Sequence, residues 1–471
     1  MKEAPGAADV ETGRRALSKV AWRLVPFLAL LYVFNIIDRS NVGFARLKMT
    51  ADLSLTDAVV DLGYGLFYVG YLLFEVPSNL LLRRLGARTW IARIMVTWGL
   101  VSMLTAFVTG PTSYYGARIL LGVAEAGFFP GIIYYLTAWF PAARRARVVA
   151  AFMMAIPISN ILGNPVSGWI MDAWDGTRGF AGWQWLFILE GIPAILLGLS
   201  VLWYLPDGPR DAAWLAADER DWLEGELARE EGARRVVGGH EKLGALADWR
   251  VWLLIALYFS VAVGTNATGA YLPKLVRDSF EPMLAASDGV VPAFVGYLPG
   301  GLRGLVEPWF TAKGVYWKVG LLTTLPSIAS IVAMAVASRI SDRVRVRAPV
   351  VAASLVAAAA GWLLAWQGAD PWSRLAGLCL AQAGMMAVLP VFWALPPLFL
   401  GGVAAAAGIA LINSVANIGG IVAPSIVGGF GIGSMAAFML EGAVAAWVAW
   451  LLLEKPVHRS TTRATGAGSD G

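Results

Sequence analysis

The chain has 471 residues, of which 58% are hydrophobic and only 15% are charged, and its mean hydropathy is +0.64. Soluble domains carry about 25% charged residues, so this composition excludes an ordinary soluble protein and indicates a membrane protein with many spans. The formal net charge of +5 does not indicate a nucleic-acid partner, because the basic residues gather in short loops, where they report topology.

Apolar windows of spanning length recur twelve times along the chain, bounded by charged residues, glycine or proline. The first follows a polar segment of mixed charge and is itself of full spanning length, so we expect it to stay in the membrane rather than to be cleaved as a signal peptide. The windows lie near 22–45, 58–82, 88–108, 112–139, 147–172, 182–205, 249–276, 316–338, 348–367, 373–400, 403–428 and 432–454.

Basic residues mark one side of the predicted membrane. By the positive-inside rule, the loops that carry them are cytoplasmic, together with both termini, in a cell (inner or plasma) membrane. The opposite loops are mixed or uncharged, as at Gly110–Ser113. The basic residues of the cytoplasmic side are Arg14, Arg15, Lys19, Arg83, Arg84, Arg88, Arg144, Arg145, Arg147, Arg339, Arg343, Arg345 and Arg347.

A polar segment over 206–248 divides the windows into two sets of six. It fits either a surface-lying amphipathic helix around Trp214–Glu231 or a solvated linker without a function of its own. The sequence thus predicts a tail over 1–19, bundles over 20–205 and 249–455, and a tail over 456–471. A long external loop over 277–315, broken by prolines, is expected to hold at most a short helix around Val290–Leu298.

Four ionisable residues fall inside predicted spans of the first half: Asp38, Arg39, Arg118 and Glu125. Arg118 and Glu125 are seven residues apart, which places them on one helical face about 10 Å apart along the axis. A charge at that depth costs roughly 2.5–3.5 kcal/mol, so such residues pair, line a wet cavity and often act in transport. The alternative is that Arg118 and Glu125 only bridge helices. Since a buried pair is a poor source of stability, we favour a coupled site in which Glu125 and Asp38 carry protons.

The interiors of the later spans are nearly uncharged, with Glu441 as the exception, so candidate contacts there are neutral. Asn413 and Asn417 stand at i and i+4, suited either to substrate oxygens or to hydrogen bonds between helices. The other neutral candidates are Asn266, Thr268, Tyr271 and Trp393. Glu190 either is a third titrating group or, as we favour, satisfies a neighbouring helix. Toward the cytoplasmic ends, gating or helix pairing is expected of Glu75, Arg84, Arg88, Arg93, Asp342 and Arg343.

No metal or nucleotide site is expected. Two histidines, His240 and His458, are too few and too scattered to bind a metal, and the lone cysteine, Cys379, excludes an intramolecular disulfide. Gly429–Gly433 lies at a span end without a preceding strand, so it does not indicate a nucleotide loop. Protons would be the coupling ion, and no cofactor is predicted.

Several stretches resemble the anion:cation symporter branch of the major facilitator superfamily. They are Ile37–Phe44, Gly70–Asn79, Gly86–Arg93, Arg118–Gly131, Gly182–Gly191 and Ala407–Ser414. The resemblance implies two pseudo-symmetric six-helix bundles. It also implies uptake of organic anions with protons, with proton-coupling and anion-binding positions on Asp38, Arg39, Arg118 and Glu125 and with Tyr71 in the cavity.

The sequence therefore predicts a monomeric, all-α transporter that takes up a small organic carboxylate with protons by alternating access. Sugar acids, dicarboxylates and aromatic acids are the candidate substrates. An exporter or antiporter is the alternative, because Gly163–Gly168 faintly resembles the antiporter glycine-proline motif. A membrane enzyme or receptor is not expected, since no catalytic constellation and no sizeable soluble domain is visible.

Overall fold

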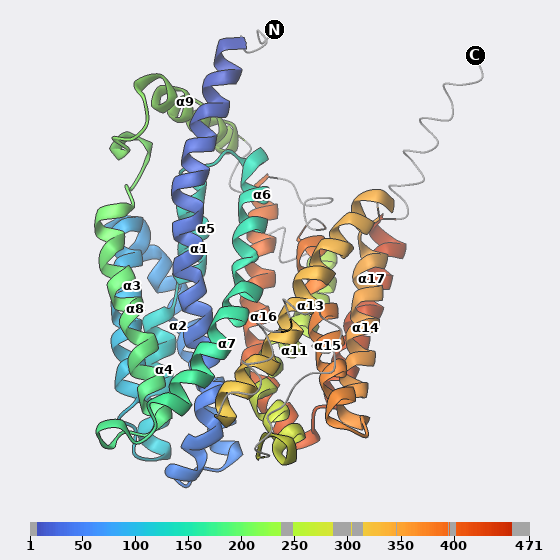
Figure 1. Ribbon diagram of the computed structural model, residues 1–471. Coiled ribbons are helices and arrows are strands. Elements are labelled where there is room, and N and C mark those ends of the chain that lie inside the picture. Colours follow the sequence, from blue (N-terminus) through green and yellow to red (C-terminus); the bar gives the residue numbers. More distant parts are fainter. Residues whose placement is uncertain are drawn as a thin grey trace, which may run out of the picture. The chain divides into compact units, whose positions relative to one another are not determined.

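The computed structural model describes residues 7–236, 248–285, 303, 314–344, 346–393, 395 and 402–454. Nearly all of these residues are helical (Figure 1). The predicted short helix around Val290–Leu298, most of the external loop and the end of the linker lie outside the described residues.

Each of the twelve predicted spans corresponds to a helix or to two consecutive helices in the described part of the chain, which confirms the all-α fold class. Ten helical segments there are long and apolar enough to cross a membrane, one of them formed by α4 and α5 together. The helices are α1 (Ala7–Asp52), α2 (Asp57–Leu85), α3 (Ala87–Thr105), α4 (Pro111–Glu125), α5 (Phe128–Thr137), α6 (Ala142–Met153), α7 (Ala155–Ala173), α8 (Gly182–Tyr204), α9 (Ala217–Val236), α11 (Trp249–Ala285), α13 (Val315–Val344), α14 (Ala348–Gln367), α15 (Pro371–Phe392), α16 (Gly402–Phe430) and α17 (Ser434–Ala449), with short 3₁₀ or π segments at Thr177–Gly179, Pro209–Asp211 and Trp450–Glu454.

Local sequence explains where several helices begin. Proline occupies the first position of α4 and of α15, where the missing N–H would have no helical partner. Asp370 caps α15, because its carboxylate accepts hydrogen bonds from the N–H groups of Trp372 (2.9 Å) and Ser373 (3.1 Å). The Ser373 backbone N–H, helped by its hydroxyl, holds the pKa of Asp370 below the usual range. The charged cap is therefore present at neutral pH and is lost only as the pH falls through that lowered pKa.

By packing, the chain forms two compact units. Unit 1 comprises Met1–Arg39, Val69–Ser159 and Gln184–Gly239, and unit 2 comprises Ser40–Tyr68, Asn160–Trp183 and His240–Gly471. Unit 2 therefore combines two segments of the first half of the sequence with the second half. Within unit 1, α3 packs on α4 and α5, and within unit 2, α14 packs on α15 and α17 and α11 on α16. The predicted division into six-span halves stays a prediction.

The linker helix α9 packs against the start of α1 within unit 1. Lys19 pairs with Glu219 at 2.7 Å, and the Glu219 side chain is only 1% exposed. Arg15 pairs with Asp218 at 3.2 Å, and Leu223 is fully buried. Two ion pairs therefore hold the described part of the linker against the start of α1.

The span predicted over 112–139 is broken into α4 and α5 at Ala126 and Gly127. Gly127 has φ +85°, a left-handed conformation that glycine adopts without strain. Here the Ser78 hydroxyl donates to the carbonyl oxygen of Ala126 at 2.6 Å, which satisfies one of the backbone groups that the break leaves open. Glu125 is the last residue of α4, so the break immediately follows the charged face.

Replacing Gly127 by alanine is expected to destabilise the protein by about 1–2 kcal/mol or more. The left-handed backbone conformation disfavours a side chain, and the new Cβ would lie 2.5 Å from the Ser78 hydroxyl oxygen. The thermal unfolding midpoint, followed by tryptophan fluorescence in detergent, measures the loss. Gly116→Ala is the matched control, since Gly116 lies in α4 with no atom within 4 Å of its added Cβ. An equal loss in both variants would contradict the argument.

Candidate functional site

The candidate site in unit 1 centres on the carboxylate of Glu125. α4 buries one face, on which Arg118 (1% exposed) and Glu125 (0% exposed) lie seven residues apart, together with Leu121 and Gly122. The helix thus places both ionisable side chains in the protein interior, as the spacing in the sequence predicts. Neither residue is in contact with bulk solvent in this state.

Two side chains of α1 bind the same oxygen of Glu125. Arg39 donates from Nε to Oε2 at 2.8 Å, and the Asn35 amide donates to Oε2 at 2.9 Å. Oε1 has no hydrogen-bond partner among the described residues. A carboxylate buried to this degree is stable only when it is paired, so Arg39 compensates its charge. Oε1 remains an atom that can take a proton without breaking either of these two hydrogen bonds.

Arg39 also contacts α2. Its guanidinium lies 5.0 Å from the centre of the Tyr71 ring, in a cation–π arrangement. Glu75 follows Tyr71 by one helical turn, is 7% exposed and interacts electrostatically with Arg39. α2 approaches α4 closely here, since a Cβ on Gly70 would lie 2.5 Å from the carbonyl oxygen of Ile119. Glu75, predicted as a gating residue, therefore lies beside the Arg39 site.

Asp38 is held separately from Arg39, its neighbour in the sequence. It is 1% exposed and accepts a hydrogen bond from the Ser102 hydroxyl of α3. Adjacent residues of a helix point about 100° apart, so the Asp38 and Arg39 side chains leave α1 in different directions. Of the four residues expected to form one site, the structure joins Arg39 and Glu125 directly and buries Asp38 and Arg118 in the same unit.

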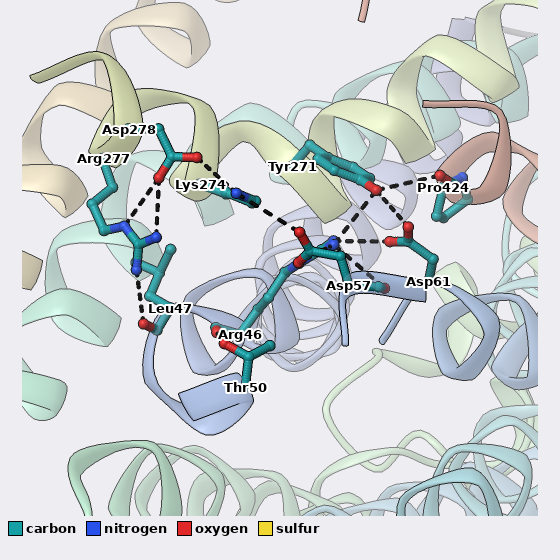
Figure 2. Close-up of polar contacts among 10 residues, drawn as sticks. All are labelled: Arg46, Leu47, Thr50, Asp57, Asp61, Tyr271, Lys274, Arg277, Asp278 and Pro424. Carbon is teal, nitrogen blue, oxygen red and sulfur yellow. Dashed lines mark hydrogen bonds and ion pairs between the residues drawn. The ribbon is translucent and has the colours of Figure 1, made fainter. Parts of the chain in front are cut away.

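The neutral candidates of the second half lie in unit 2, and two of them contact residues that precede them by about 200 positions. The Tyr68 hydroxyl donates to the side-chain oxygen of Asn266. Tyr271 donates to Asp61 and lies under the guanidinium of Arg46, 4.4 Å from ring centre to Cζ (Figure 2). In this state both predicted substrate contacts are occupied by protein groups.

The remaining neutral candidates do not converge on one point. Thr268 donates to the Gly264 carbonyl of its own helix, at 2.9 Å, and Trp393 packs edge-on against Tyr258, with ring centres 5.0 Å apart. Asn413 and Asn417 are half-buried on α16. These observations leave their predicted roles as predictions.

The predicted gating residues lie mostly at helix ends. Arg84 of unit 1 is exposed, the Arg88 backbone N–H donates to Asp207 at 3.0 Å, and Arg93 lies 3.9 Å from the Trp90 ring centre. In unit 2, Asp342 and Arg343 are exposed in the last turn of α13. Glu190 is buried in α8, and Glu441, although exposed, accepts a 2.8 Å hydrogen bond from Ser260.

Several polar residues of these sites are absent from the sequence-based prediction. Asn35 lies one turn before Arg39, and an i, i+4 reading of α1 could have found it. Lys318, which lies in the first turn of α13 and is 5% exposed, is a buried charge that the prediction does not include. It was overlooked because it stands near the start of its window, where charged residues are ordinary. Arg46 and Asp61 were overlooked for the same reason.

Comparison with known proteins shows which family the chain resembles in sequence. The sequence profile described as Major Facilitator Superfamily matches residues 28–316. The chain is 44% identical to a "Putative tartrate transporter" of Agrobacterium vitis, over 89% of both chains. It is 41% identical to the "Putative metabolite transport protein NicT" of Pseudomonas putida, over 89% of both. It is 37% identical to a "Quinolone resistance transporter" of Acinetobacter baumannii, over 93% of this chain and 95% of the relative.

Among solved structures, the xylose transporter XylE of E. coli, in a partially occluded inward-open conformation, resembles this chain with a TM-score of 0.64. The alignment covers 92% of this chain and 98% of XylE at 15% sequence identity. At that identity the likeness shows the fold alone.

Proposed function

This chain belongs to the Major Facilitator Superfamily, and from that premise we propose that it carries a small organic carboxylate into the cell together with protons. The named relatives agree with the anion:cation symporter branch that the motifs predicted. Family membership makes the chain a multi-pass membrane transporter rather than an enzyme. The substrate class, the coupling ion and the direction are the proposal.

The observation that carries this proposal is the buried pair of Arg39 and Glu125. Arg39 is 21% exposed whereas Glu125 is fully buried, so an anion that enters the site meets the arginine first. A guanidinium binds a carboxylate through two parallel N–H donors, which suits it to hold an organic acid. We therefore assign anion binding first to Arg39, with the 1%-exposed Arg118 as the second cation.

Exchange of partners at Arg39 would couple the two ligands. When the substrate carboxylate takes the guanidinium, Glu125 loses its counter-charge in a buried site and becomes easier to protonate. A proton bound to Glu125, in turn, releases Arg39 for the substrate. This is a coupling free energy between two sites and is reciprocal, so anion and proton tend to bind and leave together. Asp38, buried against Ser102, is the second candidate proton carrier.

The side chains of the candidate sites indicate which chemical class of substrate could bind. Arginines for carboxylates, and asparagine and threonine side chains for hydroxyls, suit a hydroxylated or dicarboxylic acid, and the name of the Agrobacterium relative supports tartrate-like compounds. Tyr71 and Trp393 suit a ring-bearing acid. Binding can be screened with purified protein by thermal shift against sugar acids, dicarboxylates and aromatic acids, because a ligand stabilises the folded state by mass action.

The test of function is uptake into proteoliposomes under an imposed pH gradient. With the acid that binds best, we expect accumulation that needs an acidic exterior and is abolished by a protonophore. Binding without gradient-driven accumulation would overturn proton coupling. Absence of binding by every acid would overturn the substrate class.

An exporter is the second candidate. The Acinetobacter relative is named for quinolone resistance, and Gly163–Gly168 of α7 resembles the antiporter motif. Inverted vesicles discriminate the two directions: energised accumulation of the substrate in them favours export, and its absence alongside whole-cell uptake favours import. The monomeric state and the cytoplasmic placement of both termini stay predictions.

A further inference from the structure

Unit 2 contains a second polar cluster, separate from the residues that contact Glu125 in unit 1. We call it the latch cluster: Arg46 of α1, Asp57 and Asp61 of α2, and Tyr271 and Lys274 of α11 (Figure 2). It lies where α1 ends and α2 begins, which the predicted topology places outside the cell. The anion-binding proposal does not use its charges.

The strongest contacts of the latch cluster stay within the α1–α2 hairpin. Arg46 donates from Nη1 to Asp61 at 2.9 Å and from Nη2 to Asp57 at 2.7 Å. The Arg46 side chain is 2% exposed and the Asp61 side chain 5% exposed. Arg46 is therefore paired with both aspartates inside the hairpin, although one arginine leaves one negative charge of the two aspartates uncompensated.

The contacts that reach α11 are a hydroxyl–carboxylate hydrogen bond, a cation–π contact, one long ion pair and one hydrogen bond to a backbone oxygen. The Tyr271 hydroxyl donates to the second oxygen of Asp61, and its ring lies under Arg46. Lys274 is 3.9 Å from Asp57, beyond hydrogen-bond distance, and prefers Asp278 at 2.7 Å. Arg277 donates to the backbone oxygen of Leu47 at 2.8 Å. Separation of α11 from the hairpin would thus leave Arg46 and Asp61 paired.

Close backbone approaches surround the Tyr271–Asp61 bond. A Cβ on Gly43 of α1 would lie 2.8 Å from the carbonyl oxygen of Gly269 in α11, and one on Gly65 of α2 would lie 2.9 Å from that of Ile421 in α16. Gly428 of α16 leaves the room that Asp61 occupies, since its Cβ would lie 2.6 Å from a carboxylate oxygen. Such packing exists only while these helices are in contact.

We infer that Tyr271 and Asp61 form a reversible latch that closes the outer end of the transporter and opens once in each transport cycle. A hydroxyl has one proton to donate, and Tyr271 has a second acceptor nearby, the Pro424 carbonyl at 3.4 Å. On release from Asp61 the hydroxyl can therefore stay hydrogen-bonded. Opening then exposes a paired arginine and aspartate rather than an unpaired charge. The free-energy cost of opening is therefore small.

The two predicted substrate contacts Asn266 and Tyr271 are both hydrogen-bonded to residues of α2 near the latch. The Tyr68 hydroxyl of α2 donates a hydrogen bond to Asn266. Asp61, two turns earlier in α2, accepts one from Tyr271. α2 therefore holds both α11 side chains in the latched state. Opening of the latch would release both of them together.

The experiment measures the latch directly, by electron–electron distance spectroscopy between nitroxide labels. Ala58→Cys in α2 and Glu281→Cys in α11, both exposed, are labelled in a Cys379→Ser background. Tyr271→Phe removes only the hydroxyl, so we expect the ratio of long-distance to short-distance populations to rise by about two- to tenfold, the effect of one lost hydrogen bond. Gly43→Val, which cannot fit against Gly269, is expected to shift nearly the whole population to long distances.

Tyr115→Phe is the control, since Tyr115 lies in α4 of unit 1, and it should leave the distances unchanged. Thermal unfolding of every labelled variant checks that it is folded. Unchanged distances in Tyr271→Phe alongside long distances in Gly43→Val would mean that the helices part without a hydroxyl latch, and would overturn the inference. Unchanged distances in both would overturn it too. The inference rests on the proposed transport cycle, but this readout needs neither substrate nor proton gradient, so the two can fail separately.

Discussion

Glu125→Gln is expected to abolish proton-driven accumulation, by tenfold or more, while exchange of substrate between two compartments continues. Glutamine retains an oxygen that can accept the hydrogen bonds from Arg39 and Asn35, at 2.8 and 2.9 Å in the unaltered protein, but it cannot carry a proton. Two assays on the same proteoliposomes separate the effects: uptake under an imposed pH gradient, and counterflow without one.

Glu190→Gln is the matched control for this result. Glu190 is also a buried carboxylate of unit 1, 6% exposed, but it lies on α8 rather than on α4. We expect it to retain gradient-driven uptake. Normal accumulation by Glu125→Gln would remove Glu125 from the coupling mechanism.

Arg39→Ala is expected to abolish substrate binding and also to destabilise the protein by about 3–5 kcal/mol, because it leaves the fully buried Glu125 carboxylate without its cation. The double variant Arg39→Ala with Glu125→Gln removes that unpaired charge. It should recover most of the stability and none of the binding. Unfolding midpoints and a radioligand binding assay, run on the same preparations, measure the two quantities.

This comparison separates a structural arginine from a binding arginine. If the double variant recovered substrate binding together with stability, Arg39 would be only a partner of Glu125. Arg118→Ala in the same assay tests the second cation, and we expect it to lose anion binding as well. Arg118→Lys is not a suitable control, since an ammonium cannot reproduce a bidentate guanidinium contact.

The spans were predictable because each one is a long apolar window with charged or helix-breaking residues at its ends. α14 has the predicted bounds, 348–367. α1 and α13 extend beyond their windows, to Ala7 at the start of α1 and to Val344 at the end of α13, because helical turns outside the apolar region do not appear in a hydropathy pattern. The break at Gly127 could not be predicted, since glycine is common inside membrane helices and only its φ angle marks the kink.

The charged residues of the site were predictable from the cost of placing them inside a membrane, and their pairing was not. The sequence singles out Arg39 and Glu125 but contains nothing that joins residues 86 positions apart, a link that depends on the packing of α1 against α4. Two charged residues of the latch cluster were not predicted, for a different reason. Arg46 and Asp61 lie near span ends, where a charged residue has little free-energy cost in the membrane. Their position therefore gives no reason to predict a site.

The break in the fourth span also places the carboxyl end of α4 at the Glu125 site. Since α4 ends at Glu125, the carbonyl groups of its last turn point past that residue and leave the negative end of the helix dipole there. That end attracts a cation whether or not Glu125 is charged. In the proposed cycle, the backbone would therefore help to keep the Arg39 guanidinium in place while its carboxylate partner changes.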